Sequence, residues 1–311
     1  MIPNQPVPTP PAAFNPRRGT LVTRDYLQKL IKKGVGSGER ESYRPWLKIR
    51  SVPSKGTSRT VPGVRVARGH HCLSNSEYMF LVLMEFNQDI MDIREQFPLI
   101  DYDETYSIAL QKNIRPALYI GTDVPFVFTA DFMLSFAQPG KEPSLVAISL
   151  KYREEINAAS VDKRKRIFEK QEIEKEYWVR RGVKSKLCFY EDLPHTKIKN
   201  LIILRDYANL PLSVASNNNL HKIISFFEVL ADPEGIENIS LRSLLRLVSQ
   251  NVYMEYKTAK DLFFYLVWHK KIVINLDLHE LNLSKPIMGL RVPSSNPHSG
   301  RSSLNGYPLH G

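Results

Sequence analysis

Two neighbouring segments of the chain have the residue patterns of strands, and only a short loop joins them. In the range 125–136 every second residue is large or apolar, running from Phe126 through Phe132 to Leu134, which is the period of a half-buried strand. Residues 144–152 form the second segment, and the loop 138–143 between the two contains Pro and Gly. Because so short a connection favours a hairpin, the sequence predicts an antiparallel strand pair.

Polar residues on this strand pair point to a catalytic site. Asp131 is the ionisable residue of the first strand, while Ser149 and Lys151, two residues apart, share a face of the second. Carboxylate oxygen suits a hard cation such as Mg²⁺, and a lysine ammonium nearby can orient or help deprotonate an attacking water and offset transition-state charge. An Asp facing a polar-x-Lys on an antiparallel neighbour is the arrangement of the PD-(D/E)xK nuclease core. An acidic residue on an upstream helix completes such a site, and Glu77 is the candidate.

Each of these residues also has a purely structural interpretation. Glu77 ends the motif Ser74-Asn-Ser-Glu77, so it fits the N3 position of a capping box at the start of a helix. Asp131 among apolar residues needs a partner, and a salt bridge to Lys151 would provide one. The run His70-His71-Cys72 suggests zinc, but no second cluster supplies the missing ligands. The glycines of 34–38 lack the flanking residues of a phosphate loop and indicate a flexible linker.

The order of patterns along the chain predicts an α/β protein with two folded parts. Residues 1–20 are rich in Pro and end in basic residues, which predicts a disordered basic arm. Helices are expected over 23–33, from 78 onward and over 160–181, and further strands over 93–99 and 186–190. From about residue 200 helical patterns dominate (220–230, 240–248 and 258–270), followed by a strand-like stretch at 271–276. The expected domains are a catalytic domain over 21–197, a small, mostly helical winged-helix-like domain over 198–291 and a disordered tail over 292–311.

Charge is distributed unevenly along the 311 residues. The chain carries 43 Lys and Arg against 32 Asp and Glu, a net charge of +11, and the excess is concentrated in the first 70 residues, ahead of an acidic stretch over 71–150. A basic arm beside an acidic centre indicates a polyanionic partner with a cation site nearby. The apolar runs are far shorter than the ~18–20 residues that span a bilayer, and the N-terminal segment has no signal-peptide pattern, so a cytoplasmic protein without a membrane partner is expected.

Several motifs together carry a resemblance to a known family. They are Tyr43-Arg-Pro-Trp46-Leu47, His70-His71-Cys72-Leu73-Ser74-Asn-Ser-Glu77, Asp92-Ile-Arg-Glu-Gln-Phe-Pro-Leu99, Thr129-Ala-Asp131-Phe132, Ala147-Ile-Ser-Leu-Lys151 and Glu174-Lys-Glu-Tyr-Trp178. Over residues 30–195 the chain resembles the TnsA endonuclease subunit of heteromeric, cut-and-paste transposases. The resemblance implies a restriction-endonuclease-like PD-(D/E)xK core followed by a winged-helix-type domain.

The resemblance also implies the functional residues and the reaction. Glu77, Asp131 and Lys151 correspond to the family's catalytic set, with Glu77 and Asp131 as ligands of Mg²⁺, expected as two ions for which Mn²⁺ can substitute. Ser149 stands where the family commonly has glutamine, and its hydroxyl can reach the hydration shell of the ion. The backbone carbonyl of Leu150 is expected to supply a further metal ligand. The implied activity is cleavage of the 5′, non-transferred strand at transposon ends.

The implied partners are double-stranded DNA at the transposon ends, a TnsB-like DDE integrase and a TnsC-like AAA+ ATPase in a bacterial cytoplasm. Two alternatives stay open at this point. One is a non-catalytic DNA- or protein-binding adaptor with a nuclease-like fold, which the complete Glu77, Asp131 and Lys151 set disfavours. The other is a stand-alone restriction-type nuclease, which shares the chemistry but not the partners.

Overall fold

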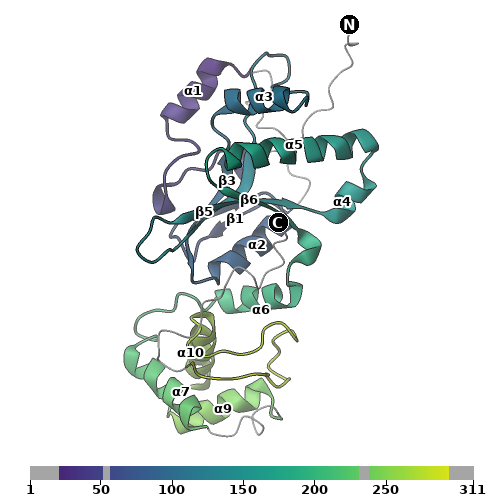
Figure 1. The fold of residues 1–311 in the computed structure, drawn as a ribbon. Helices are drawn as coiled ribbons and strands as arrows, with labels where there is room; N and C mark the ends of the chain where they lie inside the picture. Colours follow the sequence, from purple (N-terminus) through teal and green to yellow (C-terminus); the bar gives the residue numbers. More distant parts are fainter. Residues whose placement is uncertain (1–20, 52–56, 231–237, 294–311) are drawn as a thin grey trace. The chain divides into compact units, whose positions relative to one another are not determined.

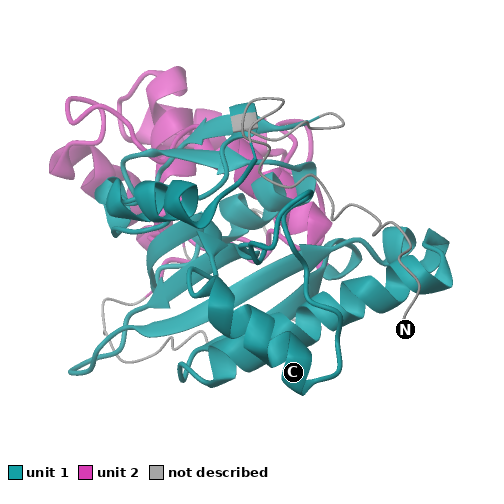
Figure 2. Ribbon diagram, turned by 90° about the horizontal axis from the view of Figure 1, so that it is seen from above, with its two compact units in different colours: residues 1–192, 307–311 teal, residues 193–306 magenta. Residues whose placement is uncertain are grey.

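The computed structural model describes residues 21–51, 57–230 and 238–293. The chain divides into two compact units, the first ending at Asp192 and the second beginning at Leu193 (Figure 2). The predicted arm 1–20 and nearly all of the predicted tail 292–311 lie outside the described residues. The predicted domain boundary at 197/198 falls inside helix α6 (His195–Arg205), and the assignment of functions to the two parts stays a prediction.

The first unit is built on a four-stranded sheet of order β3-β4-β5-β6 (Figure 1). β3 (Ile90–Pro98), β4 (Thr129–Phe136) and β5 (Ser144–Lys151) are antiparallel neighbours, and β6 (Lys184–Phe189) runs parallel to β5. The predicted antiparallel pairing of β4 and β5 is therefore confirmed. Since neighbouring strands alternate in direction, the end of β3, the start of β4 and the end of β5 lie together at one edge of the sheet.

Helices cover both faces of this sheet. Helix α2 (Asn75–Glu85) packs on one face, where the ring centroids of Phe80 and Phe132 are 5.3 Å apart. Met133, the next residue of β4, points to the other face and packs against Ile173 and Trp178 of α5 (Val161–Val179), with α3 (Tyr102–Gln111) beside them (Figure 1). The mixed α/β class predicted from the sequence is thus observed, with the core split between the two sides of the sheet.

Local sequence signals explain where the helices of this unit begin and end. The hydroxyls of Thr23, Ser74 and Ser160 accept hydrogen bonds from backbone N–H groups in the first turns of α1 (Arg24–Lys32), α2 and α5, which satisfies donors that lack a partner in the helix. Gly182 follows α5 with φ +65°, and its N–H donates to the carbonyl of Val179, a left-handed C-terminal stop.

Two segments differ from the predictions. The polar stretch before residue 70 contains a hairpin of β1 (Arg59–Pro62) and β2 (Gly69–Cys72), because its alternation was too short to stand out. The predicted flexible linker at 34–38 is wrong: the Gly36 N–H donates to the Arg44 carbonyl at 2.6 Å, and a Cβ on Gly36 would lie 2.4 Å from Cγ of Pro98. Glycine is needed there because the chain passes directly over the end of β3.

The remaining elements are a short helix and three 3₁₀ turns in the first unit and four α-helices among the described residues of the second. The first unit also contains α4 (Arg153–Ala158) and the 3₁₀ turns η1 (Arg40–Ser42), η2 (Ile49–Ser51) and η3 (Tyr190–Asp192). The second contains α6, α7 (Asn217–Val229), α9 (Leu241–Asn251) and α10 (Tyr256–Trp268). The predicted helices after residue 200 are present, whereas the strand predicted at 271–276 appears as a single antiparallel bridge between Val273 and Arg291.

The second unit is organised around α10 and one buried amide. The apolar side chains of Leu262, Phe263 and Leu266 on α10 are completely buried. The buried Asn200 of α6 donates from Nδ2 to the carbonyls of Leu276 and His279 at 2.8 and 2.7 Å, which fixes the segment after the bridge residue Val273. Within the described ranges, no helix has the length and apolar character that crossing a membrane requires.

Candidate active site

Asp131, Leu150 and Lys151 meet at the sheet edge formed by the start of β4 and the end of β5. The backbone N–H of Leu150 donates to Oδ2 of Asp131 at 2.5 Å, and Nζ of Lys151 donates to the Leu150 carbonyl at 2.9 Å. In the described part of the chain no ion pair joins Asp131 to Lys151, so the salt bridge considered as a structural role is absent there. The arrangement leaves the Asp131 carboxylate, the Leu150 carbonyl and the ammonium of Lys151 next to one another.

Glu77 reaches the same region from the first turn of α2. Its Oε1 accepts from the Ser74 hydroxyl at 2.9 Å, and its Oε2 accepts from the Leu73 N–H at 2.9 Å and from Nε2 of Gln96 at 3.0 Å. Its own N–H donates to the Ser74 hydroxyl at 3.2 Å. The N-cap half of the predicted capping box is therefore present, whereas the backbone bond to the Glu77 carboxylate comes from Leu73 rather than from the N-cap residue Ser74, and three donors hold the carboxylate.

The carboxylate of Glu77 is in a strongly perturbed electrostatic environment. Burial, followed by the negative charge of Asp131, raises the pKa of Glu77 to about 8, although the hydrogen bonds from Leu73, Ser74 and Gln96 act in the opposite direction. Two carboxylates that repel each other at a buried site are a common signature of a functional site, because a bound cation or a proton must balance them. Glu77 and Asp131 are therefore electrostatically linked, as the predicted site requires.

Ser149 belongs to a polar cluster on the α5 side of the sheet. Its hydroxyl donates to Oε2 of the buried Glu174 at 2.9 Å, and Nζ of Lys170 lies 3.0 Å from Oε1 of Glu174. Burial alone would lower the pKa of Lys170, but the charges of Glu174 and Asp131 outweigh it and the pKa is raised. Ser149 therefore binds a carboxylate in this structure, while Lys170 adds a second cationic group near Asp131.

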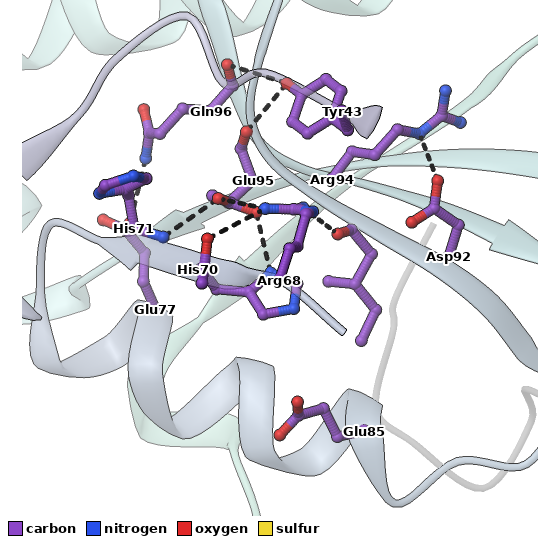
Figure 3. Close-up of polar contacts among 12 residues, drawn as sticks. Tyr43, Arg68, His70, His71, Glu77, Glu85, Asp92, Arg94, Glu95 and Gln96 are labelled. Carbon is purple, nitrogen blue, oxygen red and sulfur yellow. Dashed lines mark hydrogen bonds and ion pairs between the residues drawn. The ribbon is translucent and has the colours of Figure 1, made fainter. Parts of the chain in front are cut away.

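His70 and His71, which suggested a metal motif, lie in a network around Glu95 (Figure 3). Arg68 donates to both oxygens of Glu95 at 2.8 and 2.6 Å, Nδ1 of His70 lies 2.9 Å from Oε2, and the N–H of His71 donates to Oε1 at 3.0 Å. Burial opposes ionisation of Glu95, but the hydrogen bonds from His70 and Arg68 prevail and lower its pKa to about 2. This network ties β2 to β3 immediately beside Gln96.

Three site residues were not predicted from the sequence: Gln96, Lys170 and Glu174. Lys170 and Glu174 stand four residues apart on α5, a spacing that brings side chains together, but the many other charges of this helix conceal them. Gln96 could have been found from strand register, because Glu95 pairs with Phe132 and Phe97 with Ala130, which leaves Gln96 facing Asp131. An uncharged residue in a strand carries no signal without that register.

The donor set of the site fits a hard divalent cation. The Asp131 carboxylate, the Glu77 carboxylate and the Leu150 carbonyl offer oxygen atoms, which Mg²⁺ prefers, and Mg²⁺ typically takes one or two carboxylates together with substrate phosphate. In the residues that the structure describes, no three His, Cys, Asp or Glu side chains gather into a cage that could hold an ion by themselves. The mutual repulsion of Glu77 and Asp131 gives a physical reason for a cation at this edge.

Comparison with known proteins agrees with this geometry. Residues 87–188 match the family model described as TnsA-like endonuclease N terminal. The chain is also 31% identical over 157 residues to transposon Tn7 transposition protein TnsA of Escherichia coli. That match covers 50% of this chain and 54% of the Tn7 protein, so it spans about half the length of its relative. The region that holds β3 to β6, with Asp131 and Lys151, is thus the region that is similar to the TnsA-like endonuclease family.

Proposed function

We propose that this chain is the Mg²⁺-dependent DNA endonuclease subunit of a cut-and-paste transposase, cleaving the 5′, non-transferred strand at the transposon ends. The observation that carries the proposal is the convergence of Glu77, Asp131 and Lys151 at one edge of a mixed sheet, within a chain that is similar to TnsA. We assign the first unit to a PD-(D/E)xK core on this basis. The helices and bridge of the second unit support a winged-helix-like domain.

The residues of the chain would divide the work at the scissile phosphate. Asp131, Glu77 and the Leu150 carbonyl would hold Mg²⁺ or Mn²⁺, as two ions when substrate is bound. The cation supplies Lewis-acid polarisation of the phosphate and a more acidic water. Lys151 would place its ammonium against the phosphate oxygens and offset the charge that develops there. Ser149, bonded to Glu174, would contribute to the hydration shell of the ion through its hydroxyl.

The partners follow from the same assignment. Double-stranded DNA at the transposon ends would be the substrate, a TnsB-like DDE integrase would cut and join the 3′ ends, and a TnsC-like AAA+ ATPase would regulate both. We expect little cleavage by the isolated subunit, because no element of the sequence indicates recognition of a specific DNA site. A non-catalytic adaptor and a stand-alone restriction-type nuclease are the alternatives, and one experiment separates all three.

The test is strand-specific nicking of labelled transposon-end DNA in Mg²⁺, with and without the integrase and ATPase. The wild-type chain should nick the 5′ strand only in the presence of its partners. Asp131→Asn should abolish nicking, while Asp123→Asn, a matched change of charge at an exposed residue of the segment before β4, should leave it unchanged. Site-specific cutting by the single subunit would favour the restriction-type enzyme, and wild-type nicking by Asp131→Asn would refute the assigned site.

A further inference from the structure

We propose that Gln96 is a positioning residue of the site, which holds the Glu77 carboxylate so that Oε1 faces the cation. The inference rests on the function proposed above and extends it to a residue of β3. Gln96 is 2% exposed, and its Nε2 lies 3.0 Å from Oε2 of Glu77 (Figure 3). The two side chains belong to different elements, so their hydrogen bond ties the first turn of α2 to the end of β3.

Counting lone pairs indicates which oxygen of Glu77 is available. An ionised carboxylate offers about four acceptor positions, two on each oxygen. Oε2 accepts from Leu73 and from Gln96, so both of its positions are occupied, whereas Oε1 accepts only from the Ser74 hydroxyl among the hydrogen bonds described here. Gln96 thus completes one oxygen and leaves a lone pair on the other, which a cation can use.

The backbone of Gln96 supports a functional role. Its φ is +49°, a left-handed conformation that costs energy for any residue with a Cβ and that persists where the surroundings enforce it. The surroundings do so here: the Trp46 N–H and the Tyr43 hydroxyl both donate to the Gln96 carbonyl, at 3.3 and 3.4 Å. An unusual conformation at the position facing Asp131 directs the amide towards Glu77.

Glu95, the residue before Gln96, is also held firmly in place. Glu95 is completely buried and is held by Arg68, His70 and the N–H of His71, and its carbonyl accepts from the Tyr43 hydroxyl at 3.0 Å. The hairpin β1–β2 and the loop that carries Tyr43 therefore both form hydrogen bonds to Glu95, the residue that precedes Gln96. Residues that orient a metal ligand typically change metal affinity or activity by about 10–100-fold when they are replaced.

The experiment measures metal affinity without measuring cleavage. Mn²⁺ is titrated into wild-type protein, Gln96→Met and Gln96→Gly, and the melting temperature is measured at each concentration. An ion that binds only the folded state stabilises it by RT ln(1 + c/Kd), where c is the Mn²⁺ concentration, so a fit of this dependence gives the Mn²⁺ concentration for half-saturation. Met keeps the volume of the side chain but has no N–H donor. Gly removes the side chain and also relieves the left-handed backbone, so it keeps the test open if Gln96→Met fails to fold.

We expect the Mn²⁺ concentration for half-saturation to be about 10-fold higher, or more, in both variants than in the wild type. Both variants should still melt cooperatively in the absence of metal. If Gln96 served only to shape the left-handed backbone at this position, the Mn²⁺ concentration for half-saturation would not change, and Gln96→Gly would match the wild type. Equal half-saturation in all three proteins overturns the inference about Gln96 while the metal site stands. A wild-type melt that Mn²⁺ does not move refutes the metal site itself, and the inference with it.

Discussion

Replacing Glu77 by Gln should change how the stability of the metal-free protein depends on pH. In the folded state the pKa of Glu77 is about 8, against 4.5 for an ordinary glutamate. Between these values the folded protein holds a proton on Glu77 that the unfolded chain has released. Stability therefore falls as the pH rises through this window, because folding must either bind a proton or bury a charge next to Asp131.

The size of the effect follows from the shift. One pH unit corresponds to about 1.4 kcal/mol, so the wild type should lose about 3 kcal/mol between pH 4.5 and pH 7 and about 5 kcal/mol by pH 8 through this group. The glutamine of the Glu77→Gln variant has no proton to release. Its carbonyl oxygen can accept from Leu73 and Gln96, and its NH₂ can donate to the Ser74 hydroxyl, so the hydrogen bonds survive the substitution.

The assay is urea unfolding of wild type and Glu77→Gln at pH 5, 7 and 9, without metal and with Mg²⁺. Without metal, the variant should gain stability relative to the wild type as the pH rises. Mg²⁺ should stabilise the wild type most at high pH and the variant much less, because the cation replaces the proton. The exposed Glu41→Gln serves as a control with no such trend. Parallel pH curves for wild type and Glu77→Gln would refute the electrostatic reasoning.

Three further changes test the surroundings of the site. Asp131→Ala should abolish cleavage while the metal-free melting temperature stays within a few degrees or rises, because a repelling charge is lost; a much lower melt with retained nicking would contradict this role. Glu95→Gln should lower the free energy of unfolding, measured in urea, by about 3–5 kcal/mol, since it breaks a buried ionic network. Because the pKa of Glu95 is about 2, the stability advantage of the wild type over this variant should fade as the pH falls from 4.5 towards 2. An unchanged unfolding midpoint at pH 7 would contradict this role. Lys170→Met should cost less, about 1–2 kcal/mol, because the Lys170 side chain is partly exposed. A melt equal to the wild type would show that Glu174 does not need this cation.

The residue pattern of the sequence predicted the central strands β4 and β5 but not the hairpin β1–β2. The strands with Asp131 and Lys151 could be paired because the first has a long alternating pattern and the loop between the two is short. The hairpin β1–β2 could not be predicted, since each strand has four residues and the buried positions of β2 hold His70 and Cys72 rather than a run of β-branched residues. It contacts β3 through Glu95, which lies 25 positions after His70 along the chain.

The same contrast holds for the candidate site. Asp131, Ser149 and Lys151 could be grouped because their spacing in two adjacent strands determines their faces. Gln96 on β3 and the pair Lys170 and Glu174 on α5 join them through tertiary contacts. Ionisable residue types attract attention in a sequence, whereas an amide that orients one of them becomes visible when the strand register is known.

The two interpretations of Glu77, helix cap and metal ligand, require the same geometry. The first turn of a helix favours a carboxylate, because its free N–H groups and dipole are positive there, and the Ser74 and Leu73 donors hold the Glu77 side chain in that position. These interactions would lower the pKa of a carboxylate if they acted alone. Burial and the charge of Asp131 exceed them, so the helix N-terminus holds Glu77 in place without balancing its charge. A cation beside Oε1 would supply that balance, and the capping interaction would then position the ligand rather than compete with its function.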